Sequence, residues 1–237
     1  MHKIAHKLYW TITKVSRSTK ITRLVVDYAA LYFFKIFRKN RKFTFNKKRY
    51  KYFYHIYNRT VASERVVEIP IAVSIIEKYK NKRILEMGNV LSHYIETAHD
   101  VLDKYELAPG VINEDVVDFR PKKKYDLIIS VSTMEHVGWT YGEKKDSRKF
   151  LKGLKNIKSM LKKGGFIVVT FPVGYRKDLT NLIKTSKMPL KEEYFMKRVS
   201  YLNEWKQVSK KEALKGDNYE GHFANANVLY IGMEKRK

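Results

Sequence analysis

The pattern of apolar and polar residues changes about a third of the way along the chain. Before that point apolar residues recur at helical spacing among many cations, and residues 1–40 predict a basic, amphipathic helix. Beyond it, short apolar runs alternate with mixed segments, which is typical of buried strands. The predicted strands cover residues 83–87, 99–104, 111–113, 125–131, 165–171, 205–209 and 227–234.

Two helices are predicted among these strands. Pro70 is placed to open a helix over 71–80, because proline is tolerated in a first helical turn. A second helix is expected over 147–162, with Asp146 as its N-cap and Gly164 at its end. Strands that alternate with helices predict an α/β fold with a Rossmann-like, doubly wound and mostly parallel sheet.

Residues 40–58 interleave aromatic side chains with Lys and Arg. Such a mixture can stack bases and hold phosphates. It can also turn its aromatic rings to a core while the lysine stems cross the surface, which is the interpretation we favour. We therefore expect an N-terminal basic helical extension over 1–58 and a main domain over 59–237.

The charge of the chain is concentrated near its N-terminus. The formal net charge is +25, and residues 1–60 hold 16 Lys and Arg against one acid, Asp27. This asymmetry points to an anionic partner: lipid head groups, nucleic acid or a phosphorylated substrate. The alternative is a solvated basic surface without a partner.

The apolar stretch over 24–37 is too short to span a bilayer, which needs about 20 apolar residues. It either lies in an anionic membrane interface or packs against the main domain, and the sequence leaves both open. The chain has no cysteine, which suits a reducing compartment. We expect a cytoplasmic protein, with a peripheral place at the inner membrane face as the membrane alternative.

Acidic residues follow three successive predicted strands. Glu86 and Gly88 lie where the first strand ends, and a helix just after them would direct its N-terminal dipole at a carboxylate. Asp103 ends the second strand, where an acid can accept hydrogen bonds from ribose hydroxyls. Glu114 and Asp115 follow the third. In an open α/β sheet, ligands bind at this carboxyl edge, where the strand order reverses.

Five segments resemble the core of class I SAM-dependent methyltransferases, in the order and spacing of that family: ILEMGNVLSHY, VLDKYE, VINEDVVDF, YDLIISVSTMEHVG and LKKGGFIVVTFPVGY. The set is also similar to uncharacterised methyltransferase-like proteins associated with surface-glycan genes. The resemblance implies a seven-stranded sheet whose last strand, over 227–234, inserts antiparallel. It implies S-adenosyl-L-methionine (SAM) as cofactor. One departure is that the first loop keeps a single glycine, Gly88, where the family has two or three.

The resemblance also implies roles for individual residues. The cofactor-binding residues it implies are Glu86, Gly88 and Asn89 at the methionine end, Asp103 at the ribose, Asp115 and Val116 at the adenine, and Ser130 and Ser132 along the methionine arm. Met134, Glu135 and His136 would face the acceptor. His136 is the candidate general base, since an imidazole titrates near neutral pH, and Glu135 would orient it or bind substrate. No cluster has metal-ligand spacing, so no metal is expected.

The sequence therefore predicts methyl transfer from SAM to an unidentified acceptor: a glycan, a lipid-linked compound or another small-molecule hydroxyl. One alternative is an RNA methyltransferase that uses the basic N-terminal region, although nucleic acid is not the favoured partner. Another is a non-catalytic binding protein that kept the fold and lost the cofactor, because fold alone does not establish activity.

Overall fold

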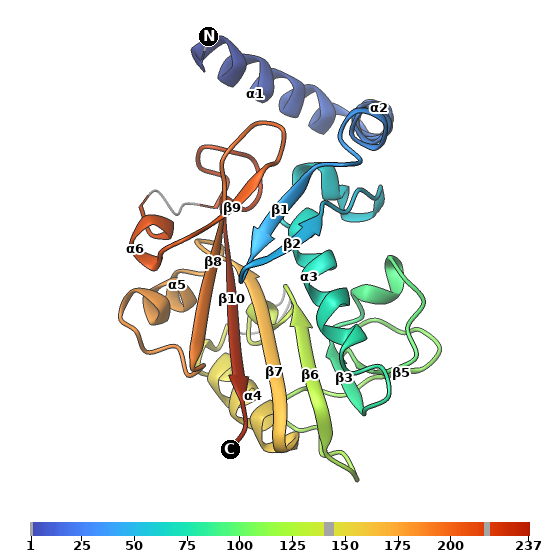
Figure 1. Cartoon of the computed structure of the whole chain (residues 1–237), viewed down its shortest axis with the longest axis vertical. Coiled ribbons are helices and arrows are strands. Elements are labelled where there is room, and N and C mark those ends of the chain that lie inside the picture. The colour runs from blue at the N-terminus through green and yellow to red at the C-terminus, as the bar shows by residue number, and fades with distance from the viewer. Residues whose placement is uncertain (1, 140–144, 216–218) are drawn as a thin grey trace. The chain divides into compact units, whose positions relative to one another are not determined.

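The computed structural model describes residues 2–139, 145–215 and 219–237, and the chain divides into two compact units (Figure 1). One unit, here called the helical unit, contains residues Met1–Ile71 and Phe195–Val228. The other, the sheet unit, contains Ala72–Tyr194 and Leu229–Lys237. The expected boundary between an N-terminal extension (1–58) and a main domain (59–237) remains a prediction.

The sheet unit is built on parallel strands. Its strands are β3 (Ile84–Met87), β4 (Asp100–Leu102), β5 (Val111–Ile112), β6 (Tyr125–Val131), β7 (Leu161–Pro172) and β10 (Val228–Lys235). They are ordered β5-β4-β3-β6-β7-β10, and β8 (Glu192–Arg198), which starts in this unit, comes next. All neighbours from β5 to β7 are parallel, and β10 runs antiparallel to β7. The strand order reverses between β3 and β6.

This topology confirms the predicted α/β fold with a mostly parallel central sheet and an antiparallel strand near the C-terminus. The expected number of seven strands was wrong, because β9 (Trp205–Val208) pairs with β8 and brings the described sheet to eight strands. Within this sheet, the sequence analysis missed β8, which begins with two glutamates and ends with Lys197 and Arg198. Its apolar residues lie together in the middle and do not alternate with polar ones. The predicted strand at 205–209 is present as β9 (Trp205–Val208), paired antiparallel with β8.

Helices α3 (Arg65–Glu77) and α4 (Ser147–Met160) lie on opposite faces of the sheet (Figure 1). The apolar stripe of α4 is fully buried, and Asp146 accepts a hydrogen bond from the Arg148 amide as the expected N-cap. The short helix α5 (Lys177–Lys184) follows β7. Between β3 and β6, the connections contain one 3₁₀ turn, η2 (Leu91–His93), and no α-helix.

Two predicted helix boundaries were wrong. Pro70 lies inside α3 and does not open it, because the residues before it, Val66, Val67 and Ile69, are fully buried and packing extends the helix towards the N-terminus. Helix α4 ends at Met160, before Gly164, because Leu161 already has extended backbone angles (φ −71°, ψ 143°) and starts β7.

The helical unit begins with two helices, not the single one expected over 1–40. Helix α1 (His2–Ser18) and α2 (Lys20–Phe37) are separated at Thr19, whose side chain caps α2 in a reciprocal pair with Thr22. No helix in the described part of the chain is long and apolar enough to cross a membrane. The 3₁₀ helix η1 (Tyr57–Ala62) and the short α6 (Lys210–Ala213) belong to the same unit.

Residues 40–58 contain a hairpin of β1 (Lys42–Phe45) and β2 (Lys48–Lys51), which the sequence analysis did not predict. Its turn places Asn46 and Lys47 at positive φ, which matches the geometry of a tight hairpin turn. Phe43 and Phe45 are buried while the lysines are exposed. Phe43 and Phe45 therefore face a core, as the favoured interpretation predicted for the aromatic residues of this segment.

Glu64 is a buried acid in the helical unit. Its side chain lines a polar cavity of about 380 Å³ together with Arg23, Arg59 and Arg65. All three arginines already pair with other carboxylates: Arg23 and Arg59 with Asp27, at 3.8 and 2.7 Å, and Arg65 with Glu68 at 3.1 Å. Burial, reinforced by the nearby Glu68 carboxylate, raises the pKa of Glu64 above its ordinary value.

Candidate functional site

The loop after β3 is organised by Glu86. This side chain is fully buried, and its Oε1 accepts hydrogen bonds from the amides of Val90 (3.0 Å) and Leu91 (2.8 Å). Its Oε2 lies 2.8 Å from Nε2 of His99. Both carboxylate oxygens of Glu86 thus bond to groups of the protein itself, and Glu86 fixes the shape of the loop. The helix expected after Gly88 is replaced by the three-residue η2, so no α-helix dipole points at this loop.

Gly88 turns the chain where β3 ends. Its φ is +83°, and its amide donates to the Leu102 carbonyl on β4 (2.9 Å). A Cβ at this position would lie 2.2 Å from Oγ1 of Thr133, which follows β6. Glycine is therefore required twice, for the left-handed backbone and for the close approach of Thr133. Thr133 was not among the predicted site residues, since nothing in its sequence neighbourhood indicates this contact.

Asp103 joins the ends of β3 and β4. Its Oδ2 accepts from the Asn89 amide (3.1 Å), and its Oδ1 accepts from the amides of Tyr105 (2.8 Å) and Glu106 (2.9 Å). The Asn89 side chain in turn donates to Glu106 at 2.7 Å. A carboxylate offers about four acceptor positions. Asp103 is thus held rigidly and retains capacity for one further hydrogen bond.

Asp115 lies after β5 and is paired with two lysines. Its Oδ2 is 2.7 Å from Nζ of Lys149 on α4 and 3.2 Å from Nζ of Lys104, the residue after Asp103. Burial alone would raise the pKa of Asp115, but the hydrogen bonds from Lys149, the Val117 amide and Lys104 outweigh it and lower the pKa below its ordinary value. Val116 is buried, and its carbonyl accepts from Asn156 on α4 at 2.7 Å.

Ser130 and Ser132 lie where β6 ends, next to β7. Ser130 is buried, and its Oγ accepts from the Met134 amide at 3.3 Å. Ser132 has a positive φ of 40°, and its amide donates to the Thr170 carbonyl on β7 at 3.0 Å. Strained backbone of this kind is frequent at functional sites. Thr170, which also donates to the Ser130 carbonyl, was not predicted.

Glu135 and His136 belong to the 3₁₀ turn η3 (Met134–His136) that follows β6. The Glu135 side chain is buried, whereas the His136 side chain is 48% exposed, and their nearest charged atoms are 4.0 Å apart. The His136 ring meets the Tyr175 ring edge-on at 5.4 Å between centroids. The His136 side chain is therefore accessible to an incoming molecule, and it lies next to the Glu135 carboxylate and the Tyr175 ring.

Arg176 holds this turn in place, and the sequence analysis missed it. Its side chain is buried, and its Nη1 donates to the carbonyls of Glu135 (2.8 Å) and Val137 (2.9 Å). Its Nη2 pairs with Asp178 at 2.5 Å, and its guanidinium lies 4.9 Å from the centre of the Trp139 ring. Arg176 follows β7, so it links the loops after β6 and β7.

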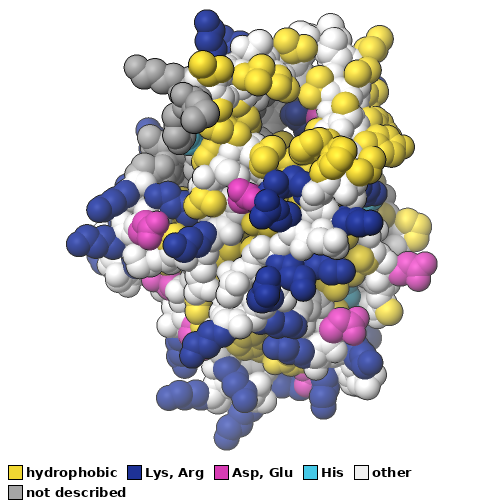
Figure 2. All heavy atoms as spheres, turned by 45° about the horizontal axis from the view of Figure 1, so that its top comes forward, with side chains coloured by type: hydrophobic (Ala, Val, Ile, Leu, Met, Phe, Trp, Pro, Cys, Tyr) yellow, Lys and Arg dark blue, Asp and Glu magenta, His cyan; other side chains and the backbone are white. Residues whose placement is uncertain are grey.

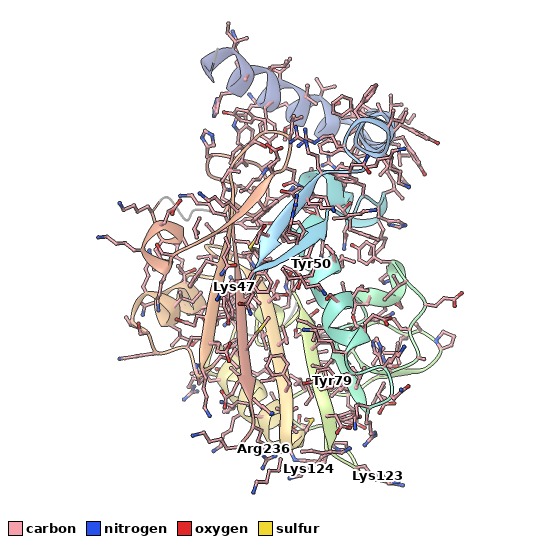
Figure 3. All side chains as sticks on the ribbon, viewed as in Figure 1. Lys47, Tyr50, Tyr79, Lys123, Lys124 and Arg236 are labelled. Carbon is pink, nitrogen blue, oxygen red and sulfur yellow. The ribbon has the colours of Figure 1, made fainter. Side chains whose placement is uncertain are left out.

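Taken together, the predicted residues lie at one edge of the sheet. Direct contacts join the loops after β3, β4 and β6 at Gly88 and Asp103, while Asp115 is connected to β4 through Lys104. Residues 92–97, which follow the first loop, line an open hollow of about 630 Å³. Figure 3 shows Lys123, Lys124 and Arg236 at the opposite edge, where β6 begins and the antiparallel β10 ends.

Comparisons with known proteins found a match to one family model and similarity to solved structures. Residues 78–185 match a family described as "Caenorhabditis protein of unknown function, DUF268". No curated protein sequence matches the chain.

Among solved structures, a SAM-dependent methyltransferase from Archaeoglobus fulgidus is similar, with 14% identity, a TM-score of 0.46, and coverage of 72% of this chain and 95% of that one. The N-methyltransferase NodS from Bradyrhizobium japonicum, in complex with S-adenosyl-L-homocysteine (SAH), has 11% identity, a TM-score of 0.41, and coverage of 76% and 95%. The 1,6-didemethyltoxoflavin-N1-methyltransferase from Burkholderia thailandensis has 9% identity, a TM-score of 0.42, and coverage of 72% and 79%. The fold assignment rests on the strand order of this chain and not on these likenesses.

Proposed function

We propose that this chain is a SAM-dependent methyltransferase. The observation that carries the proposal is the construction of the sheet edge where the strand order reverses. There, Gly88 and Asp103 bring the loops after β3 and β4 together, and Thr133 closes on Gly88 from the loop after β6. Cofactors of open α/β folds bind at this position.

The donor set at this edge fits an adenosyl cofactor. In the proposed site Asp103 accepts from the ribose with its remaining acceptor position, because its carboxylate is already fixed by three backbone amides. Asn89 and the backbone at Gly88 hold the methionine end, and Ser130 and Ser132 lie along it. Asp115 and Val116 take the adenine. Glu86 acts through the loop that it shapes.

SAM supplies an activated methyl group, so the protein mainly has to align the acceptor and exclude water. His136 is the group that would accept a proton from a hydroxyl acceptor, since it is exposed at the sheet edge. Glu135 and Arg176 keep the turn that carries His136 in one position. The proposed acceptor is a small-molecule, glycan or lipid-linked hydroxyl, and the cytoplasmic location remains a prediction.

Calorimetric titration with SAM and with SAH tests the cofactor site. We expect micromolar binding that Asp103→Ala weakens roughly tenfold or more, because a hydrogen bond to a charged group contributes about 1.5–3 kcal/mol. Asp118→Ala is the matched control, since Asp118 is an exposed acid after β5 outside the proposed site. Thermal unfolding checks that both variants are folded. A folded wild-type protein that binds neither compound would favour the non-catalytic alternative, and equal binding by Asp103→Ala would remove the ribose assignment.

A further inference from the structure

The outer surface of α1 and α2 is strongly apolar. Of the 19 exposed large hydrophobic side chains among the described residues, 12 belong to these two helices. On α1 they are Ile4, Leu8, Ile12 and Val15, and on α2 they are Ile21, Leu24, Val25, Tyr28, Tyr32, Phe33, Ile36 and Phe37. Figure 2 shows apolar side chains gathered over this part of the molecule. A contiguous exposed patch of this kind marks an interaction surface.

The opposite sides of α1 and α2 contact other residues of the helical unit. Leu31 and Phe34 of α2 pack with Val61 in a buried cluster. Asp27 is buried and pairs with Arg59 at 2.7 Å. On α1, the Tyr9 hydroxyl accepts a hydrogen bond from the Ala224 amide at 2.9 Å. The exposed apolar rows therefore point away from the contacts that fix the helices.

Cations border the apolar rows. Lys7 and Lys14 on α1, and Lys20, Arg23 and Lys35 on α2, are all exposed. The single acid of residues 1–60 is Asp27, which is 5% exposed and pairs with Arg23, so the exposed charged side chains of α1 and α2 are all basic. A second copy of this chain fits poorly, because a two-fold interface would place the same cations against each other. An anionic bilayer complements both features, because its acyl chains accept the apolar rows and its head groups attract the cations.

We infer that α1 and α2 form a docking surface for an anionic lipid bilayer. The helices have 17 and 18 residues and lie in the plane of the head groups without crossing the bilayer. The aliphatic and aromatic rows enter the boundary between head groups and acyl chains. The lysines contact the phosphates, and each contributes about fivefold to the partition coefficient at low salt.

Flotation of the full chain with vesicles tests this inference. One set contains phosphatidylcholine alone, and the other contains phosphatidylcholine mixed with anionic phosphatidylglycerol. We expect binding to the mixed vesicles, weakened by salt. Val25→Glu/Phe37→Glu changes two side chains that are 64% and 72% exposed and should reduce binding at least tenfold. Leu107→Glu, at an apolar residue that is 85% exposed in the sheet unit, is the matched control and should bind like wild type.

A second variant tests the charges independently. Lys14→Gln/Lys35→Gln leaves the apolar rows intact and should lower binding to the mixed vesicles about 25-fold at low salt. Circular dichroism and light scattering report on fold and oligomeric state. The inference would be overturned by equal binding to both vesicle types, by no binding to either, or by a dimer that Val25→Glu/Phe37→Glu dissociates. The last result would identify a second copy of the chain as the occupant.

Discussion

Gly88 offers the sharpest test of how the candidate site is built. Gly88→Ala introduces a Cβ at φ +83°, where it would lie 2.2, 2.4 and 2.7 Å from Oγ1, Cγ2 and Cβ of Thr133. Gly110 is a matched control, because its φ is +80° and a Cβ there would meet nothing within 4 Å. The two substitutions therefore share the backbone cost and differ in the overlap with Thr133.

This comparison sets the expected loss of unfolding free energy for each substitution. A non-glycine residue in the left-handed region costs roughly 1–2 kcal/mol, which is the expected loss for Gly110→Ala. Contacts between carbon atoms are optimal near 3.5–4.0 Å, so the added Cβ must displace Thr133, and such overpacking costs about 1–3 kcal/mol. Gly88→Ala should therefore lose about 2–5 kcal/mol, and its affinity for SAH should fall because the loop moves.

Urea unfolding followed by circular dichroism gives both free energies of unfolding. Thr133→Ala removes Oγ1 and Cγ2, so Gly88→Ala should cost less in that background, with a coupling of about 1 kcal/mol or more. Equal losses for Gly88→Ala and Gly110→Ala, or additive effects of Gly88→Ala and Thr133→Ala, would show that Thr133 does not close on Gly88 in solution.

Two further predictions concern buried charges. Arg176→Met should lower the free energy of unfolding by about 3 kcal/mol at neutral pH. Burial raises the pKa of Asp178, but its hydrogen bonds and ion pair with Arg176 outweigh burial and lower the pKa. The loss of unfolding free energy in Arg176→Met should therefore be full above about pH 4 and shrink at lower pH. A loss that does not depend on pH would contradict the pairing of Arg176 with Asp178. Glu64→Gln should raise the free energy of unfolding by about 1–2 kcal/mol at pH 8, since the raised pKa of Glu64 makes the folded wild type lose stability as the pH rises from about 4.5. Urea titrations at about pH 3, 5 and 8 check both predictions. A gain from Glu64→Gln at pH 8 that is no larger than the gain at pH 5 would contradict a raised pKa of Glu64.

The sequence was most informative where burial dominates. The apolar runs of β3 and β6 are buried almost throughout, and both strands were predicted within a residue. The elements that were not predicted, or were predicted with wrong bounds, depend on turns and on tertiary packing. The hairpin at 42–51 has no Asn-Gly or Asp-Gly pair to mark its turn, and α3 passes through Pro70 because its first half is packed.

The same distinction holds for the candidate site. Acids that follow strands could be placed at the sheet edge from sequence, because parallel strands end at the same edge. Their partners could not be predicted. Thr133, Lys149 and Arg176 reach the site through the tertiary structure, and no local pattern distinguishes them from other threonines, lysines and arginines of the chain.

The position of β10 has a consequence for synthesis on the ribosome. This strand lies between β7 and β8 in the sheet, yet it is translated after both. At about 5–20 residues per second, roughly 3–11 s pass between the emergence of residue 172 and that of residue 228. During this interval β7 has an unpaired edge, which can pair with another nascent chain. Translation speed therefore sets how long this edge stays unpaired.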